Sequence, residues 1–154
     1  MSNRRGAGRI VPAATFRRLY QARALIESRY TEPLPLDALA RAVGLSKFHL
    51  VRTFERVYGR TPHRYLTECR LRQAKRLLRS SRLSVTEVCM EVGFSSLGSF
   101  SSLFAREVGR PPQAFQRHVR RLFPVPASYR RPFVPLCFAQ NFGAIFEKHA
   151  PPAG

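Results

Sequence analysis

The chain has 154 residues, 44% of them hydrophobic, and carries 27 Lys and Arg against nine Asp and Glu, for a formal net charge of +18. This hydrophobic content suffices for a packed core and excludes wholesale disorder, while no apolar run approaches the roughly 18 residues that span a bilayer. So large a positive charge, most of it from Arg, predicts a polyanionic partner contacted through bidentate hydrogen bonds.

Cysteine, histidine and N-terminal composition exclude further classes. The three Cys form no C-x-x-C pair and the four His have no metal-ligand spacing, so we expect neither a disulfide scaffold nor a metal site. The start, MSNRRGAGRIVPAATF, is basic but has no apolar segment of the kind found in a secretory signal. We therefore expect a cytoplasmic protein without a cofactor, in which Cys69 and Cys89 are small buried residues.

Residues 1–13 are basic and aperiodic and predict a flexible arm. A first helix is expected from Ala14 to about Arg29, because mainly apolar residues then recur at helical spacing. Pro33 and Pro35 follow, and proline cannot occupy a helix interior. The positions of this predicted stripe are Phe16, Leu19, Arg23, Ile26 and Tyr30.

A short helix, Leu36–Ala42, is followed by a turn in which Gly44 accepts a left-handed backbone and Ser46 can cap the next helix. That next helix is predicted over 47–58, KFHLVRTFERVY, and one of its faces is apolar at the i, i+4, i+7 spacing. Its expected core residues are Leu50, Phe54 and Val57.

A long helix is predicted over 62–80, with Thr61 as its cap and Pro62 at its first helical position. Arg dominates its exposed face, and its expected apolar stripe consists of Leu66, Cys69, Ala74 and Leu77. This helix is expected to join the segments on either side of it.

Ser84 and Glu87 have the spacing of a capping box and announce another helix, which ends at the turn around Gly93. SSLGSFSSLFAREV supplies the helix after that, with Phe100, Leu103 and Phe104 in the core, and Pro112 begins a last short helix, QAFQRHV. Strand alternation is not sustained before residue 120. The fold class predicted is all-α, with about seven helices.

Two segments of the chain repeat one pattern: LARAVGLSKFHLVRTFERVYGRTPHRYL and VCMEVGFSSLGSFSSLFAREVGRPPQAF. The turn glycines, the core phenylalanines and the Gly-x-x-Pro motifs of the two segments correspond in order. Each copy is a helix, a glycine turn, a second helix, Gly-x-x-Pro and a further helix, which is the layout of a helix-turn-helix.

This arrangement resembles the DNA-binding domain of the AraC/XylS family of bacterial transcription regulators. The resemblance covers about Ala14 to Val119, and its most specific part is EVGFSSLGSFSSLF followed by VGRPPQAF, with Gln116 where the family usually has Arg. It implies two helix-turn-helix subdomains joined by a long linker helix. Their second helices would enter successive major grooves of double-stranded DNA, about 34 Å apart.

The resemblance also implies which residues face the DNA. Arg52 is the strongest candidate for base contact, since an Arg fork pairs with guanine O6 and N7; a phosphate contact or a solvated side chain is its alternative role. Phe48 and Leu97 could each meet a thymine methyl. Phe48 could instead lie in the core or shield it from solvent, and Leu97 could lie in the core or be an exposed apolar side chain. The expected base-contacting residues are Phe48, Val51, Arg52, Leu97, Ser101 and Ser102. The expected backbone-contacting residues are Ser46, Lys47, His49, Arg56, Arg64, Arg70, Ser95, Ser96 and Ser99.

The expected organisation is an arm (1–13), a first subdomain with the linker helix (14–80), a second subdomain (81–119) and a tail (120–154). The Pro-rich tail shows Phe138, Phe142, Ile145 and Phe146 at helical spacing. It could dock on the body, form a dimer contact or touch RNA polymerase. No small-molecule effector site and no membrane contact are evident, and the oligomeric state is open.

Two other functions compete with sequence-specific regulation. A sequence-nonspecific architectural nucleic-acid binder would suit the net charge and the uncharged second recognition segment, Gly93 to Phe104. An enzyme is not expected, because the sequence has no phosphate-binding glycine loop, metal cluster or reactive cysteine setting. We predict that the first unit carries most of the sequence specificity and that the second mainly positions the protein.

Overall fold

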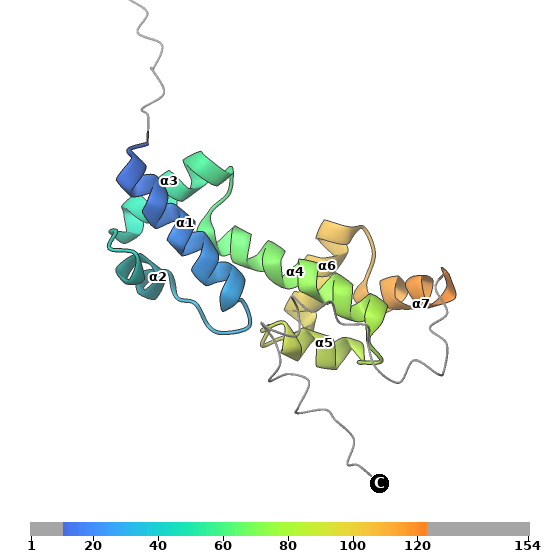
Figure 1. Cartoon of the computed structure of the whole chain (residues 1–154). Helices are drawn as coiled ribbons and strands as arrows, with labels where there is room; N and C mark the ends of the chain where they lie inside the picture. Colours follow the sequence, from blue (N-terminus) through green and yellow to red (C-terminus); the bar gives the residue numbers. More distant parts are fainter. Residues whose placement is uncertain (1–10, 123–154) are drawn as a thin grey trace, which may run out of the picture. The chain divides into compact units, whose positions relative to one another are not determined.

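The computed structural model describes residues 11–122, which form seven α-helices and no strand (Figure 1). The all-α prediction is therefore confirmed over this part of the chain. The helices are α1 (Ala13–Ser28), α2 (Leu36–Ala42), α3 (Lys47–Tyr58), α4 (Pro62–Ser80), α5 (Val85–Glu91), α6 (Leu97–Val108) and α7 (Pro112–Leu122).

Helix α7 is longer than predicted. It continues to Leu122, so residues 120–122, assigned to the tail by sequence, belong to the helix. Arg120 and Arg121 lie in its last turn, where positive charge interacts favourably with the helix dipole. The rest of the predicted tail, with Phe138, Phe142, Ile145 and Phe146, lies outside the described residues, as does most of the predicted arm.

The described residues fall into two compact units. The first runs to Gln73 and includes Met90–Ser95, and the second consists of Ala74–Cys89 and the residues from Ser96 onward. The division between these compact units lies inside α4, while the boundary after residue 80 stays a prediction. Helix α4 is long enough to supply buried side chains to both units, so a contact-based division falls within it.

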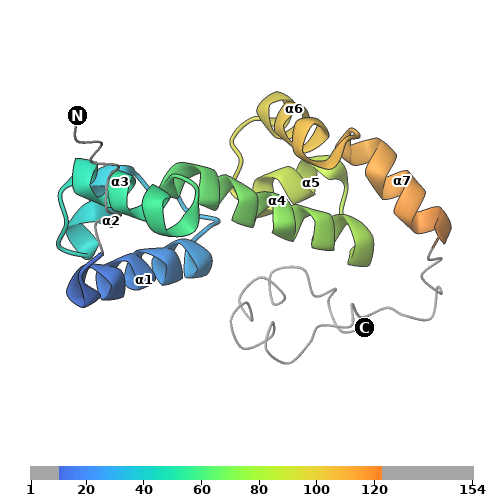
Figure 2. The same cartoon turned by 90° about the horizontal axis from the view of Figure 1, so that it is seen from above.

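The first unit has a core between α1, α2 and α3, which lie side by side in Figure 2. Leu19, Ile26, Leu50 and Phe54 are almost fully buried there. The prediction for α1 was partly wrong, because Phe16 is 50% exposed and Ala22 is buried in the same helix. Leu19, Ala22 and Ile26 follow the i, i+3, i+7 spacing of one helical face, and Phe16 lies off the centre of that face.

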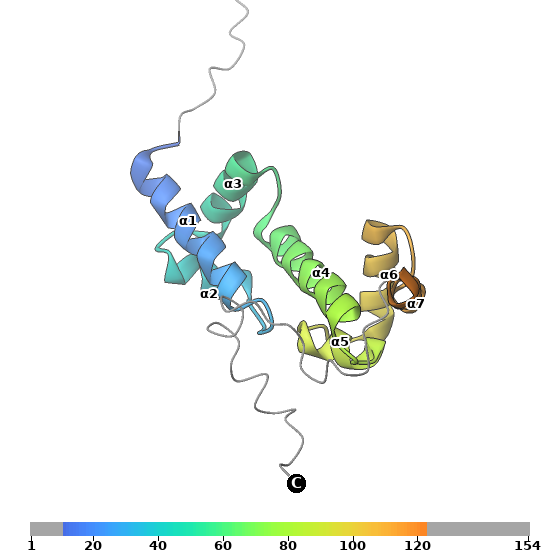
Figure 3. The same ribbon diagram turned by 45° about the vertical axis from the view of Figure 1, so that its right-hand side comes forward.

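The second unit is built around aromatic rings from α6 and α7, which lie side by side in Figure 3. The rings of Phe100 and Phe104 have centroids 5.6 Å apart, and the ring of Phe115 lies 5.5 Å from that of Phe104. Cys89 is also fully buried in this unit, and burial raises the pKa of its thiol. Cys69, in the first unit, is a second buried free thiol with a raised pKa, so the expectation for these two cysteines is confirmed.

A hydrogen-bonded cluster connects α1 to α4 within the first unit. The Tyr65 hydroxyl donates to Glu27 Oε1, and Arg23 Nε donates to the same oxygen over 3.0 Å. Burial, followed by the bond to Glu27, raises the pKa of Tyr65 to about 12. Partial burial acts to raise the pKa of Glu27, but the hydrogen bonds from Tyr65 and Arg23 outweigh it and keep that pKa below its usual value.

The Glu27 cluster predicts acid sensitivity. Since its folded pKa is depressed, Glu27 contributes stability above its unfolded pKa of about 4.3, and that contribution is lost as pH falls through the folded value. We expect Tyr65→Phe to cost about 1 kcal/mol at neutral pH and to flatten the pH dependence. Urea unfolding from about pH 6 to about pH 3 measures both. Parallel wild-type and Tyr65→Phe curves would contradict the assignment.

Candidate nucleic-acid interface

In the first unit, local chemistry fixes where α3 begins. Gly44, in the turn after α2, has φ +65°, a backbone conformation that glycine adopts without strain. The Ser46 side chain then caps α3 by accepting a hydrogen bond from the His49 backbone N–H over 3.3 Å. Leu50 and Phe54 lie on the buried face of α3 and anchor the helix, and its opposite face remains in solvent.

The solvent face of α3 carries the predicted base-contacting residues of the first unit. Phe48 is 81% exposed, so its ring is accessible to a partner. Arg52 and Arg56 are exposed as well, while Val51 is half-buried and less accessible. Lys47 is the first residue of α3, and its ammonium is 3.2 Å from the carboxylate of Asp37. This face combines positive charge with an exposed apolar ring, and such side chains can contact phosphates, guanine edges and thymine methyl groups.

Helix α6 begins in the same way but presents different chemistry. Ser96 caps it by accepting a hydrogen bond from the Ser99 backbone N–H over 3.3 Å. Of the predicted base-contacting residues, Ser102 is exposed, Leu97 is 43% exposed and Ser101 is half-buried. Within α6 the charged residues are Arg106 and Glu107, which are 3.3 Å apart in its last turn. The first turns of α6 therefore present small hydroxyls and no charge.

Several predicted backbone contacts remain available to a phosphate. The hydroxyls of Ser46 and Ser96 accept from the backbone and can still donate their own protons. His49, Ser95 and Ser99 are exposed. Arg64 is paired with Glu68 over 3.3 Å, yet its side chain is 67% exposed. These residues stay predictions for the DNA backbone.

Arg70, also predicted to contact the DNA backbone, has partners within the protein. Its Nε donates to the Tyr30 carbonyl over 2.7 Å and its Nη2 to the Glu32 carbonyl over 2.9 Å. Its guanidinium also lies 5.6 Å from the centre of the Phe94 ring, and burial lowers its pKa. Two of its donors are directed at the protein's own backbone, where they hold the loop after α1, and its contact with DNA phosphate stays a prediction.

Replacing Arg70 by Met is expected to lower the free energy of unfolding by about 1–2 kcal/mol, because two carbonyls lose their donors. Arg64→Met removes a cation from the same helix but only an exposed ion pair, so we expect less than about 0.5 kcal/mol. Urea unfolding followed by circular dichroism compares the two. Equal losses would restore Arg70 to the list of surface cations.

One contact near the turn was not predicted. Arg18 Nη1, on α1, donates to the Gly44 carbonyl over 2.8 Å and so supports the turn that precedes α3. The sequence gives no sign of this bond, since the two residues are 26 positions apart. Over residues 11–122, no cluster of His, Cys, Asp or Glu is suited to hold a metal ion, and no helix is long and apolar enough to cross a membrane.

Comparisons with known proteins agree with this geometry. A family model described as "Helix-turn-helix domain" matches residues 39–118, just over half of the chain. The HTH-type transcriptional activator RhaS of Escherichia coli (strain SE11) is 39% identical over 90 residues, which are 58% of this chain and 32% of that protein. The chain thus matches about a third of the length of this curated relative.

Two solved structures have the same fold. The DNA-binding domain of AdpA, a global transcriptional factor crystallised with a target DNA, is 30% identical with a TM-score of 0.66, over 69% of this chain and 96% of that one. A Chromobacterium violaceum regulator with an AraC-type DNA-binding domain is 32% identical with a TM-score of 0.64, over 74% and 100% of the two chains. The chain belongs to the AraC/XylS family of transcription regulators.

Proposed function

We propose that this chain is a sequence-specific transcription regulator that acts in the cytoplasm by binding double-stranded DNA. Helices α3 and α6 enter successive major grooves, and α3 performs most of the base readout. The observation that carries the proposal is the solvent face of α3, where exposed Phe48 and Arg52 project from a helix whose other face is buried. The AdpA domain, crystallised with a target DNA, supports it.

The unequal roles follow from the side chains of the two helices. Arg52 can form two parallel hydrogen bonds to guanine, a contact typically worth about 1–3 kcal/mol against a wrong base. A serine hydroxyl on α6, such as that of Ser102, forms at most a single unselective bond. Helix α6 therefore positions the protein through its capped N-terminus and its hydroxyls, which suit phosphate contacts.

A sequence-nonspecific architectural role is the second candidate, favoured by the net charge of +18 and by the uncharged first turns of α6. Binding-site selection from random duplexes separates the two. We expect a defined site, bound about a thousandfold or more tighter than a scrambled duplex at physiological salt. Failure to enrich a site, with a ratio near one, would establish the architectural role instead.

A further inference from the structure

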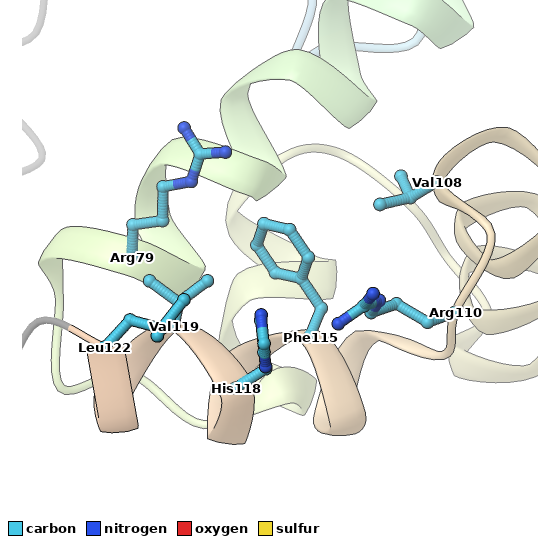
Figure 4. A pocket seen from close by; sticks show the side chains of 7 residues that line it. All are labelled: Arg79, Val108, Arg110, Phe115, His118, Val119 and Leu122. Atoms are coloured by element: carbon cyan, nitrogen blue, oxygen red, sulfur yellow. The ribbon is translucent and has the colours of Figure 1, made fainter.

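A pocket of about 520 Å³ opens on the second unit, between the end of α4, the end of α6 with the loop after it, and α7 (Figure 4). Phe115 points into its centre, between Arg79 and Arg110. None of the predicted base-contacting residues lines it. The lining residues are Arg79, Val108, Arg110, Phe115, His118, Val119 and Leu122.

The rim of the pocket is basic. Arg79, Arg110 and His118 contribute nitrogen-bearing side chains, and the lining set contains no carboxylate. The Arg79 guanidinium lies 5.5 Å from the centre of the Phe115 ring, which holds this cation over the pocket and in solvent reach. A ligand here would therefore be anionic.

The floor of the pocket is apolar, and this restricts the chemical class of ligand that can bind. Phe115 and Val119 are each only 8% exposed and form the base beneath Arg79, whereas Leu122 at the edge is 59% exposed and offers the accessible apolar surface. Contact with an apolar floor does not stabilise a bound DNA phosphate, because phosphate oxygens bind to hydrogen-bond donors. It does stabilise an aromatic or aliphatic side chain, since a buried apolar anchor inside a polar rim is the usual pattern of a peptide-binding hot spot.

We propose that this surface, the α7 pocket, binds a short acidic peptide segment of a partner protein, with an aromatic or aliphatic side chain seated against Leu122 at the edge of Phe115 and carboxylates paired with Arg79 and Arg110. A bidentate Arg–carboxylate pair is the strong form of such a contact. The α7 pocket shares no residue with the face of α3, so this proposal and DNA recognition can fail separately.

Phage-displayed random dodecapeptides are selected on the wild-type chain, with excess non-specific duplex present to occupy the DNA-binding surfaces. The pocket variant is Arg79→Glu/Arg110→Glu. The control variant, Arg117→Glu/Arg121→Glu, makes the same change in charge on exposed residues of α7 that do not line the pocket. Circular dichroism verifies that both variants are folded.

We expect the enriched peptides to combine Asp or Glu with one large apolar residue. Their affinity should fall about tenfold or more in the pocket variant and change less than about twofold in the control. Equal losses in both variants would mean diffuse electrostatic attraction, and absence of enrichment would mean no peptide site; either overturns the proposal. Weaker DNA binding by the pocket variant but not by the control would assign the pocket to phosphate and overturn it too.

Discussion

Replacing Gly93 by alanine is expected to lower the free energy of unfolding by about 2–4 kcal/mol. Gly93 lies in the turn between α5 and α6 with φ +86°, where a side chain strains the backbone. A Cβ at this position would lie 2.4 Å from the Thr31 carbonyl oxygen and 2.9 Å from the Thr31 carbonyl carbon. Both are backbone atoms, so no flexible side chain can move aside to relieve the overlap.

The chain supplies matched controls for this effect. Gly59 and Gly109 have φ values of +70° and +80°, and a Cβ added at either would meet nothing within 4 Å. Alanine at these positions carries the left-handed backbone cost alone, about 1–2 kcal/mol. Urea unfolding of the three variants separates backbone strain from steric overlap. A loss at Gly93 no larger than that at Gly59 would show that the loop containing Thr31 adapts freely.

The helix boundaries could be predicted because they depend on neighbouring residues. The predicted capping box is present, with the Ser84 N–H donating to Glu87 Oε2 over 2.7 Å and the Glu87 N–H donating to Ser84 Oγ over 3.2 Å. Gly44 and Gly93 likewise adopt the left-handed conformations expected of the two turns. Such signals need only a few consecutive residues.

The errors concern residues whose environment comes from distant segments. In α4 Leu78 is fully buried, whereas its predicted neighbour Leu77 is only half-buried, because the packing partners select one of two adjacent apolar positions. Arg70 finds its carbonyl partners 40 and 38 residues upstream. Composition marks Arg70 as one more cation for DNA, and only the tertiary structure shows its internal role.

The surface features also differ in whether they depend on neighbouring residues or on distant segments. That Phe48 and Arg52 lie on the exposed face of α3 followed from helical periodicity around Leu50 and Phe54. The α7 pocket did not, because its basic rim comes from α4 and from the loop after α6, which no single periodic pattern joins. The first turns of α6 carry serines and no charged residue, as the sequence predicts, and Ser102 is exposed while Ser101 is half-buried; their weak base readout stays a prediction.

Alanine at Arg52 is expected to weaken binding to the selected site by about 1–3 kcal/mol and to relax preference at one base pair. Arg52 is exposed, and within residues 11–122 its guanidinium has no hydrogen-bond or ion-pair partner, whereas that of Arg70 donates to the Tyr30 carbonyl. The donors of Arg52 are therefore available to a base. The loss should concentrate at a single position of the selected site, because one bidentate pair reads one guanine. Repeating the selection with the variant measures this directly.

Arg52→Lys distinguishes base readout from phosphate contact. Lysine keeps the charge, so affinity for scrambled duplex and its salt dependence should remain as in wild type, but it lacks the planar fork that pairs with guanine. We therefore expect Arg52→Lys to lose most of the preference at that base pair, whereas a phosphate contact would tolerate the substitution. The double variant Ser101→Ala/Ser102→Ala is the comparison from α6, with an expected loss below about 1 kcal/mol. A larger loss there than at Arg52 would reverse the roles proposed for the two helices.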